Sequence, residues 1–461
     1  MLENKLEDAP VQAAQLDISV ILPVLNEADN LRTLLPRLRA VLDQLGLRHE
    51  LLVIDGGSRD DTAQVAGAAG ARVLPEKSPG YAGALTTGFA AARGTYILTL
   101  DADLSHDPGL IGRMWRARQI ADIVIASRYV RGGIAYTTWG RRALSRAANM
   151  VLHRLLAMPA KDLSSGYRLY HRETLADLNL EGRNFEVLEE ILIKAYARGF
   201  NITEVPFTYF PRDRGVSHAK VLRFGMDLSR ASFKLWKLRN SIESADYDAR
   251  AYYSIIPIQR FWQRRRHQII TGWARSAGRT LDAGAGSSMI IQSLSNAVAM
   301  EYNFAKTRYL RRLGIPVVRG SAFALPFRDN SFDCVISSQV IEHIPLDQVL
   351  FDEMNRVLRP GGMLIVGTPD YATLGWRIIE PLYGMLMPGG YRDEHITHYT
   401  RASLQELLDR RGLVHEETAY VARSELILRY RKPAVQKADS PAAEALASES
   451  TALRAVVEKP A

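Results

Sequence analysis

The stretch TYILTLDADLSHDP (95–108) decides the fold of the first part of this chain. Its apolar first half is typical of a buried strand, and acidic residues come directly after that strand. Two earlier strand-like runs, DISVILPVL (17–25) and HELLVIDGG (49–57), each precede a stretch with helical spacing, LRTLLPRLRAVLDQLG (31–46) and TAQVAGAAG (62–70). This alternation predicts a mostly parallel sheet with helices on its faces.

Carboxylates follow the predicted strands at the edge of the sheet where ligands bind in such folds. Asp55 follows one strand, and Asp101 and Asp103 follow another, on either side of Ala102. Two carboxylates at this spacing can converge on one hard cation, Mg²⁺ or Mn²⁺, which would also hold a substrate diphosphate. A solvated acidic turn that caps a helix starting near Pro108 explains the same pair, because the motif is short.

A second alternation of strands and turns begins near residue 279 and shares no motif with the first, which indicates a different domain. Within LDAGAGSS (281–288), Gly284 and Gly286 allow a ligand to approach the backbone. Glu301 follows 19 residues after Asp282, at the end of the next predicted strand. An acid at that place can bind both ribose hydroxyls of an adenosine cofactor, and a dinucleotide-binding fold offers the same glycines and acid.

The composition excludes several classes of protein. The 461 residues suit two large domains or three small ones, and 47% hydrophobic with 24% charged residues is ordinary for a soluble globular chain. The single cysteine, Cys334, excludes an intramolecular disulfide framework, and its apolar strand predicts a core position. No run approaches 18 apolar residues and the N-terminus lacks a secretion-signal layout, which predicts a cytosolic protein. The net charge of +9 indicates an anionic partner such as phosphate, a membrane surface or nucleic acid.

The domain boundaries follow from changes in composition. A mixture of charged and aromatic residues before the second alternation indicates a helical connection, and the C-terminal stretch without aromatics cannot bury enough apolar surface to fold. We therefore expect a flexible N-terminus (1–16), a first domain (17–240), a helical linker or start of the second domain (241–275), a second domain (276–432) and a disordered tail (433–461).

Further motifs surround the acidic pair in the first domain. They are PVLNEADN (23–30), DGGSRDDT (55–62), IASRY (125–129), TTWGRRALSRAAN (137–149), KDLSSGYRLYHRE (161–173), NFEVLEEIL (184–192), EVPFTYFPRDRGVSHAK (204–220) and WKLRN (236–240). With these motifs, residues 17–240 resemble family 2 glycosyltransferases, in particular the polyprenyl (dolichyl) phosphate mannose synthase-like branch. The resemblance implies an α/β GT-A fold, a nucleotide-sugar donor, a divalent metal and an inverting transfer to a polyprenyl phosphate.

The resemblance also implies roles for residues at matching positions. Nucleoside contacts would come from Pro23, Asn26, Glu27 and Asp55; metal and diphosphate contacts from Asp101 and Asp103; acceptor-phosphate contacts from Arg128, Arg142 and Ser145; and closure over the donor from Arg212 and Lys220. Asp103, Arg128 and Arg212 would act in catalysis. Ser105 falls where other members carry glutamine or serine, so a metal role for it stays open. The VLN run before Glu27 departs from the branch and leaves the nucleobase open.

The chemistry of the residues agrees with this resemblance. A lipid phosphate is already an anionic nucleophile at neutral pH, so the reaction needs arginines that align two anions rather than a strong base. In the stretch VLRFGMDLSRASFKLWKLRN (221–240), helical spacing places Arg223, Arg230, Lys234 and Lys237 on one stripe, with apolar residues around it. Such a helix could dock on a bilayer surface, or the second domain could cover it.

In the second half, GSAFALPFRDNSFDCVISSQVIEHI (320–344) and LRPGGMLIVGTP (358–369) resemble class I S-adenosylmethionine-dependent methyltransferases over roughly 250–430. This implies a Rossmann-like fold and S-adenosylmethionine as cofactor. The expected contacts are Asp282, Gly284 and Gly286 on the methionine side, Glu301 on the ribose, Ser321 and Ala322 beside the adenine, and Gln339 and His343 near the transferred methyl group. HITHYT (395–400) is a candidate for positioning an acceptor, and a local turn explains it as well.

Two residues depart from the methyltransferase pattern. Ser288 replaces the third loop glycine, and Ser321 replaces the usual aspartate before the LPF run. A degenerate, structural methyltransferase domain is therefore an alternative, and a satisfied surface histidine explains His343 equally well.

These expectations combine into one leading hypothesis, a bifunctional enzyme at the cytoplasmic face of the membrane. It would transfer a hexose, with GDP-mannose as the best donor, to polyprenyl phosphate, and would methylate a small molecule, glycan or lipid of the same pathway. One alternative uses a UDP-sugar and a cell-envelope glycan acceptor, with the second domain as a non-catalytic docking module. Nucleic-acid binding is disfavoured, because phosphate-bearing substrates explain the arginines and no nucleic-acid module is present.

Overall fold

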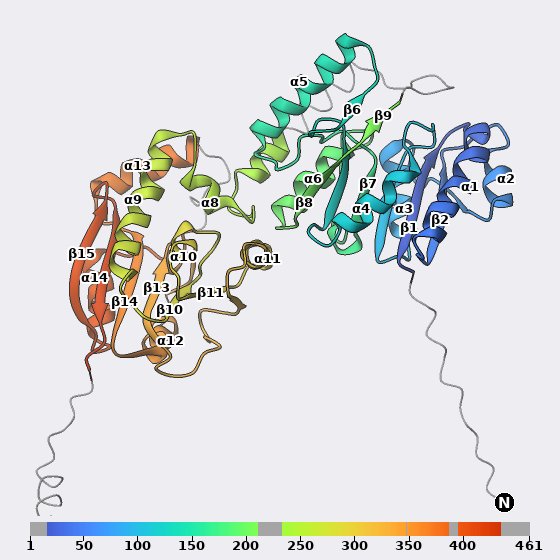
Figure 1. Cartoon of the computed structure of the whole chain (residues 1–461). Coiled ribbons are helices and arrows are strands. Elements are labelled where there is room, and N and C mark those ends of the chain that lie inside the picture. Colours follow the sequence, from blue (N-terminus) through green and yellow to red (C-terminus); the bar gives the residue numbers. More distant parts are fainter. Residues whose placement is uncertain (1–15, 211–232, 347, 387–394, 435–461) are drawn as a thin grey trace, which may run out of the picture.

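The computed structural model describes residues 16–210, 233–346, 348–386 and 395–434 of the chain. These residues form two α/β domains, each built on a seven-stranded sheet with helices on its faces (Figure 1). Nearly all of the expected flexible N-terminus and disordered tail, residues 1–15 and 435–461, lies outside the described residues, so both expectations stay predictions.

The first sheet has the strand order β3-β2-β1-β4-β7-β5-β8. Its strands are β1 (Ile18–Val24), β2 (His49–Asp55), β3 (Arg72–Pro75), β4 (Tyr96–Thr99), β5 (Ile123–Ser127), β7 (Arg168–His171) and β8 (Ile202–Pro206), and a separate pair joins β6 (Ile134–Ala135) to β9 (Thr208–Tyr209). β1 pairs in parallel with β2 and β4, whereas β7 is antiparallel to β4 and β5. The order reverses between β1 and β4, so the carboxyl ends of these strands form a switch point where ligands bind in such sheets.

The helices of the first domain cover both faces of its sheet. They are α1 (Ala28–Gln44), α2 (Thr62–Ala68), α3 (Tyr81–Ala91), α4 (Ile111–Ala117), α5 (Trp139–Leu155) and α6 (Val187–Ala197), with a 3₁₀ turn η1 (Pro108–Leu110) before α4 and η2 (Arg172–Thr174) after β7. Alternate side chains of β1 point to opposite faces, so Val20 packs against Leu31 and Leu38 of α1, and Ile21 packs with Leu85 of α3 and Ile191 of α6. The predicted strand–helix alternation is confirmed.

The second sheet has the order β12-β11-β10-β13-β14-β16-β15. Its strands are β10 (Thr280–Ala283), β11 (Ala297–Glu301), β12 (Val317–Arg319), β13 (Phe332–Ser338), β14 (Leu358–Pro369), β15 (Val414–Val421) and β16 (Glu425–Arg431). β16 lies antiparallel between β14 and β15. A dinucleotide-binding sheet has a sixth parallel strand at this edge, so the terminal antiparallel pair disfavours that alternative.

The helices of the linker and second domain are α8 (Tyr247–Tyr252), α9 (Pro257–Ala274), α10 (Met289–Gln292), α11 (Phe304–Arg312), α12 (Gln348–Val357), α13 (Leu374–Leu386) and α14 (Arg401–Asp409), with a 3₁₀ turn η3 (Ile341–His343) after β13. Cys334 is buried in β13, as predicted. Among the described residues, every helix is too short or too polar to span a membrane.

Only the end of the predicted basic helix at 221–240 falls within the described residues. Residues 233–239 are helical, whereas Arg223 and Arg230 lie outside the described part. Lys234 forms an ion pair with Glu181, and Leu235 packs into the core of the first domain. In the described part of this helix, some of the apolar surface therefore packs against the first domain itself.

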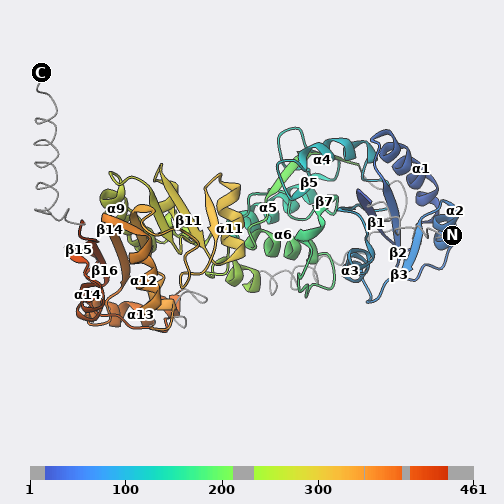
Figure 2. The same cartoon turned by 90° about the horizontal axis from the view of Figure 1, so that it is seen from below.

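The two domains contact each other where α11 lies beside the end of α6 (Figure 2). Nη1 of Arg308 donates to the carbonyl oxygen of Arg198 at 2.9 Å, and its guanidinium carbon lies 3.7 Å from the ring centre of Phe200. Gly199 has φ +85°, and a Cβ atom there would stand 2.4 Å from the carbonyl oxygen of Ala305. Only glycine permits this approach of the two backbones.

A buried ion pair holds the connection between the domains. Arg239 is fully buried, and its Nη1 lies 2.7 Å from a carboxylate oxygen of Asp246. Its Nε donates to the carbonyl oxygen of Leu156 at the end of α5. The linker is thus anchored to the first domain before α8 begins.

A buried carboxyl group on α6 predicts how stability changes with pH. Burial, with Glu186 nearby, raises the pKa of Glu189 to about 7. A raised carboxyl pKa means that the folded state binds more protons than the unfolded state between about pH 4.5 and 7, so stability falls as pH rises through that window. We expect Glu189→Gln to be neutral near pH 4.5 and to stabilise the protein by up to about 3 kcal/mol at pH 8.

Urea unfolding at both pH values measures this difference. Glu190→Gln is the matched control, because the Glu190 carboxylate accepts hydrogen bonds from two backbone N–H groups and pairs with Lys194. That variant should lose stability at pH 8. An equal pH dependence of wild type and Glu189→Gln would contradict the prediction.

Candidate functional sites

The predicted nucleoside contacts gather at the carboxyl ends of β1 and β2. The strand register pairs Pro23 with Ile54 and Val24 with Asp55. Asn26 follows β1 with φ +58°, and its side-chain oxygen accepts from the backbone N–H of Arg59 at 2.8 Å. The two loops are therefore tied together by Asn26.

The side chains of Asp55 and Glu27 also hold these loops. Asp55 accepts hydrogen bonds from the backbone N–H and the hydroxyl of Ser58, at 2.9 and 2.6 Å. The backbone N–H of Glu27 donates to the hydroxyl of Thr62, and its carboxylate accepts from Asn30 at 2.5 Å. The structure thus brings all four predicted nucleoside residues to one edge of the sheet.

The acidic pair lies in a turn directly after β4. Asp103 is buried and accepts from the backbone N–H and hydroxyl of Ser105, at 3.1 and 2.5 Å. The Asp101 side chain is 29% exposed. The donor set, two carboxylates on one turn at the switch point, fits a hard divalent cation.

A glycine lets a second loop approach this acidic turn. A Cβ atom on Gly166 would stand 2.7 Å from the hydroxyl of Tyr81 and 3.5 Å from a carboxylate oxygen of Asp101. The Tyr81 hydroxyl lies 3.4 Å from the same Asp101 oxygen. The segment 162–166 therefore forms one wall of the acidic turn.

His106 is a site residue that the sequence did not reveal. It is buried, and its Nδ1 accepts from the backbone N–H of Asp101 at 3.0 Å. Its ring stacks on Tyr167 with centroids 5.0 Å apart and meets Phe207 edge-on. Burial lowers the pKa of His106, so its ring is neutral near pH 7 and carries its hydrogen on Nε2. The hydrogen bond to Asp101 is local, but the burial of His106 depends on Tyr167 and Phe207, which lie far away in the sequence.

Arg128 lies at the end of β5 in a buried ion pair. Its Nε and Nη2 donate to the two carboxylate oxygens of Asp162, at 2.8 and 2.7 Å, and Nη2 also donates to the hydroxyl of Ser164 at 2.9 Å. The Asp162 side chain is 0% exposed. This pairing orients Arg128 and offsets part of its charge, and its predicted contact with acceptor phosphate stays a prediction.

Helix α5 joins the same polar network. The hydroxyl of Ser145 accepts from Tyr129, the neighbour of Arg128, at 2.7 Å. Asn149, one turn further along α5, donates to the hydroxyl of Ser164 at 3.2 Å. The structure therefore brings Ser145 near Arg128, and Arg142 lies exposed on α5 one turn before Ser145.

Two predicted residues of the first domain cannot be placed. Arg212 and Lys220, expected to close over the donor, lie outside the described residues. Their roles remain predictions from the sequence.

The buried ion pair between Arg128 and Asp162 should contribute strongly to the stability of the first domain. Asp162→Asn leaves Arg128 without its countercharge in a buried place, which typically costs about 3–5 kcal/mol. We expect a comparable drop in the free energy of unfolding, measured by urea denaturation with a first-domain probe. The exposed Asp29–Arg32 pair supplies the control, since Asp29→Asn should cost less than about 1 kcal/mol. Equal losses in both variants would contradict a special role for the buried pair.

The second domain contains a cavity of about 620 Å³ at the carboxyl ends of β10, β11 and β13. All eight residues that the sequence predicted for cofactor binding or methyl transfer line it: Asp282, Gly284, Gly286, Glu301, Ser321, Ala322, Gln339 and His343. The sheet order reverses between β10 and β13, so this cavity also lies at a switch point.

An acidic wall lies at the glycine loop of this cavity. Asp282 is buried, and one of its carboxylate oxygens has no hydrogen-bond partner among the described residues. Burial, together with Glu301 and Asp248, raises the pKa of Asp282 to about 7. Glu301 accepts from the backbone N–H of Gly286 at 2.8 Å. This environment suits a cationic ligand, which would restore charge balance, and the ammonium and sulfonium groups of S-adenosylmethionine fit that requirement.

The glycines are needed for the shape of this loop. Gly284 has φ +82°, and a Cβ atom there would stand 2.5 Å from the side chain of Val340. Gly286 has φ +57°, and a Cβ atom there would stand 2.6 Å from the carboxylate of Asp248. Both positions therefore exclude other residues for steric reasons.

The expected linker supplies part of the cavity wall, which the sequence did not reveal. Asp248 of α8 accepts from the backbone N–H and hydroxyl of Ser287, at 3.0 and 3.1 Å, and pairs with Lys306 at 3.6 Å. Ile242, Gln263 and Arg266 line the same cavity. Residues of the 241–275 segment thus complete the second domain.

Gln339 lies opposite the glycine loop at the end of β13. It has φ +59°, and its side-chain nitrogen is buried without a hydrogen-bond partner among the described residues. Its backbone N–H donates to the carbonyl oxygen of Gly367 at 2.8 Å. Gln339 lines the cavity, and its backbone has a strained positive φ. Its side-chain amide is therefore a candidate contact for a ligand.

Comparisons with known proteins found matches to both halves of the chain. Residues 19–178 match the family model described as "Glycosyl transferase family 2", and residues 281–366 match "Methyltransferase domain". A dolichol-phosphate mannosyltransferase of Pyrococcus furiosus is 35% identical over 217 residues, which cover 44% of this chain and 60% of that protein. A polyprenol monophosphomannose synthase of Mycolicibacterium smegmatis is 33% identical over 246 residues, covering 49% of this chain and 89% of that protein.

A further relative and two solved structures are also similar to parts of this chain. An undecaprenyl-phosphate 4-deoxy-4-formamido-L-arabinose transferase of Pseudomonas fluorescens is 31% identical over 214 residues, covering 45% of this chain and 61% of that protein. Glucosyl-3-phosphoglycerate synthase of Mycobacterium tuberculosis has a TM-score of 0.39 at 24% identity, over 49% of this chain and 80% of that chain. A methyltransferase of Thermotoga maritima has a TM-score of 0.32 at 20% identity, over 38% of this chain and 90% of that chain.

Proposed function

From the premise that the chain belongs to glycosyl transferase family 2 and carries a methyltransferase domain behind it, we propose a bifunctional enzyme of lipid-linked sugar metabolism. Its GT-A domain transfers mannose from GDP-mannose to a polyprenyl phosphate at the cytoplasmic face of the membrane. Its Rossmann-like domain uses S-adenosylmethionine to methylate an acceptor of the same pathway.

One observation carries the sugar-transfer proposal. Segment 162–166 touches the acidic turn through Gly166 and holds Arg128 through Asp162 and Ser164. The residues proposed for the donor diphosphate and for the acceptor phosphate are therefore joined by five residues of chain. Such an arrangement can hold two anionic reactants side by side, which is the main requirement of this reaction.

The roles of the residues follow from this arrangement. Asp101 and Asp103 would hold Mg²⁺ or Mn²⁺, which when bound neutralises charge on the leaving nucleoside diphosphate. His106 fixes the backbone of the acidic turn through Asp101. Arg128, oriented by Asp162, and Ser145 would face the acceptor phosphate, which needs no strong base because it is already anionic.

The names of the relatives support the class of acceptor more firmly than the sugar. Dolichol phosphate, polyprenol phosphate and undecaprenyl phosphate occur in the three names, whereas the sugars are mannose in two and 4-deoxy-4-formamido-L-arabinose in one. We therefore propose a polyprenyl phosphate acceptor, with mannose as the first sugar to test.

The surface of α5 supports a place at the membrane. Trp139 at its start is 83% exposed, and Met150, Val151 and Leu155 are also exposed. A helix with exposed aromatic and aliphatic side chains beside basic residues is suited to the interface of a bilayer. The same helix carries Arg142 and Ser145, so a lipid held against it would present its phosphate to Arg128.

A donor panel tests the proposed sugar transfer. The full-length protein with Mn²⁺ and undecaprenyl phosphate should convert GDP-mannose to a lipid-linked hexose, detected by mass spectrometry, and chelation should stop it. Asp103→Asn should reduce the rate at least about 100-fold, because it removes a proposed metal ligand. Asp107→Asn, which changes an exposed helix cap, is the control and should stay near wild type.

Each other outcome has a defined meaning. Consumption of only UDP-glucose or UDP-N-acetylglucosamine would overturn the donor assignment. Sugar transfer without any dependence on the polyprenyl phosphate would overturn the acceptor assignment.

The cofactor proposal rests on the acidic wall of the second cavity. Asp282, Glu301 and the backbone at Gly284 and Gly286 would hold S-adenosylmethionine, which supplies an activated methyl group when bound. One carboxylate oxygen of Asp282 has no hydrogen-bond partner among the described residues, which supports this assignment, since a cationic ligand would compensate its burial.

Calorimetry with S-adenosylmethionine tests the cofactor proposal. Asp282→Asn should weaken binding at least about tenfold, whereas Asp352→Asn, at an exposed position on α12, should not. Because the pKa of Asp282 is about 7, its carboxylate forms between pH 6 and 7.5, so wild-type affinity should rise over that range. The Asp282→Asn variant should lack this rise. Absence of binding at millimolar cofactor would favour a non-catalytic docking domain.

A further inference from the structure

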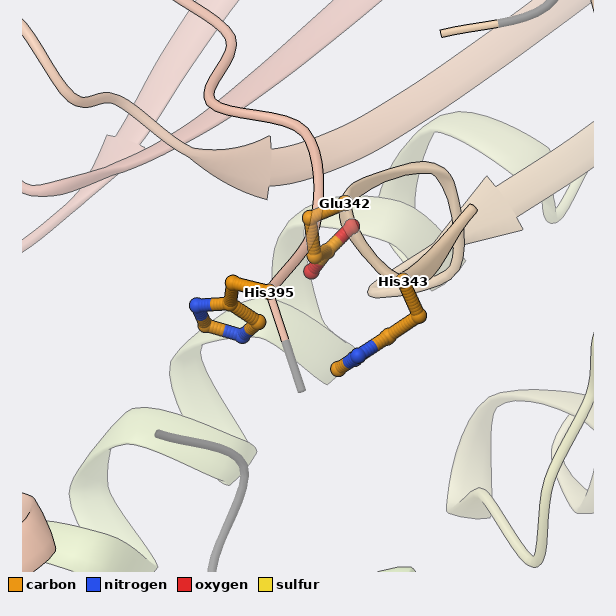
Figure 3. A group of neighbouring side chains, drawn as sticks. All are labelled: Glu342, His343 and His395. Atoms are coloured by element: carbon orange, nitrogen blue, oxygen red, sulfur yellow. The ribbon is translucent and has the colours of Figure 1, made fainter. Parts of the chain in front are cut away.

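Three potential metal ligands lie together beside the cofactor cavity. Glu342 and His343 belong to η3, directly after β13, and His395 precedes α14. One ligand atom from each lies within 4.8 Å of the others. Figure 3 shows the carboxylate of Glu342 flanked by the two imidazole rings. His343 also lines the cofactor cavity, so the cluster adjoins the place where a methyl acceptor would bind.

Glu342 is the residue of this cluster that most needs a ligand. It is 0% exposed, and neither carboxylate oxygen has a hydrogen-bond partner among the described residues. The hydroxyl of Thr368 lies beside this carboxyl group and is likewise buried without a geometrically defined hydrogen bond among the described residues. A carboxyl group in this state is costly unless something compensates it.

Backbone hydrogen bonds hold the two parts of the cluster in place. The N–H groups of Ile396 and Thr397 donate to the carbonyl oxygen of Glu342, at 2.8 and 3.0 Å. The hydroxyl of Thr397 donates to the carbonyl oxygen of Ile344 at 2.6 Å. His395 is therefore held in position against η3, although 52 residues separate it from His343.

The orientation of His395 also suits a metal ligand. Its Nδ1 lies 2.7 Å from the hydroxyl of Tyr371 and 3.3 Å from a carboxylate oxygen of Glu380. The Tyr371 hydroxyl donates in turn to Glu380 at 3.1 Å. A ring that donates from Nδ1 to such partners carries its lone pair on Nε2, which is the usual arrangement behind a metal-binding histidine.

We propose that Glu342, His343 and His395 form a binding site for a divalent metal ion of the zinc class. Two imidazoles and one carboxylate are a ligand set that zinc uses in catalytic sites, where a fourth position stays open for water or substrate. The proposal differs from the acidic turn of the first domain, whose oxygen-only ligands suit Mg²⁺ or Mn²⁺.

The open position suggests the class of methyl acceptor. A metal ion here would favour an acceptor with an oxygen ligand, such as a hydroxyl or carboxylate group. This extension rests on the proposed methyl transfer, whereas the metal site itself does not.

Metal titration of the full-length, tag-free protein tests the site. Excess Mg²⁺ occupies oxygen-only sites, and Zn²⁺ is then added in competition with a chromophoric chelator. We expect one zinc ion bound per chain, and Co²⁺ in its place should give visible absorption bands that Zn²⁺ abolishes. Glu342→Gln and His395→Gln should each weaken zinc binding at least about tenfold.

His398→Gln is the matched control. His398 lies on the same segment and stacks on Tyr371 with ring centroids 4.1 Å apart, but it does not belong to the cluster. Zinc binding equal in all three variants, or no zinc bound by the wild type, would overturn the proposal. The second result would show that the cluster is a buried hydrogen-bonded network only.

Thermal unfolding gives a readout that separates binding from misfolding. Zinc should raise the melting temperature of the wild type and of His398→Gln, because a ligand that binds the folded state stabilises it. Glu342→Gln should fold, since glutamine has the same shape and removes a buried acid, and zinc should not raise its melting temperature. A rise equal to that of the wild type would contradict the proposal. Zinc binding without S-adenosylmethionine binding would keep the metal site and reject the proposed methyl transfer.

Discussion

The buried ion pair between Arg128 and Asp162 is the interaction on which the first site depends. It places one arginine at the end of β5 and, through the same carboxylate, holds the segment that walls the acidic turn. Ser164 and Asn149 extend the pair to α5. Separating a buried ion pair would leave an uncompensated charge out of water, which costs much more free energy than separating a surface pair. The geometry of the buried pair is therefore more rigid. The regions that we propose for the donor and the acceptor are consequently positioned relative to each other by one buried contact.

The connection between the domains is part of both of them. Arg239 and Asp246 close a buried pair against α5, and two residues later Asp248 accepts hydrogen bonds from the glycine loop of the second cavity. Contacts of α11 with the end of α6 add a second link. The segment expected to be a linker therefore shapes the cofactor cavity while it is anchored to the glycosyltransferase domain. This continuity gives a structural reason for the two predicted activities to occur in one chain.

Two acids of the second domain, Asp282 and Glu342, are buried. Burial raises the pKa of Asp282 to about 7 and that of Glu342 to about 8, and both lie at or beside one cavity. Asp162 and Glu425, by contrast, are buried carboxylates that pair with arginines. Buried acids without a positively charged partner concentrate at binding sites, because a bound ligand can supply the positive charge that the protein itself lacks there. Our proposals assign a different cation to each of these acids, an organic cation to Asp282 and a metal ion to Glu342.

The sequence by itself determined the fold class and the two-domain organisation, and it predicted eight of the residues that line the second-domain cavity. Strand–helix alternation, glycine spacing and acids at strand ends are local signals, and the matches to both families confirm the domains they predicted. Tertiary structure alone revealed the partner of Arg128, the packing of His106 against Tyr167 and Phe207, the cavity wall formed by Asp248, and the meeting of His395 with Glu342. These contacts join residues through separate strands and loops, and a linear pattern carries no information about which loops a folded sheet brings together. Periodicity reports the face on which a side chain lies, whereas only packing decides what it touches.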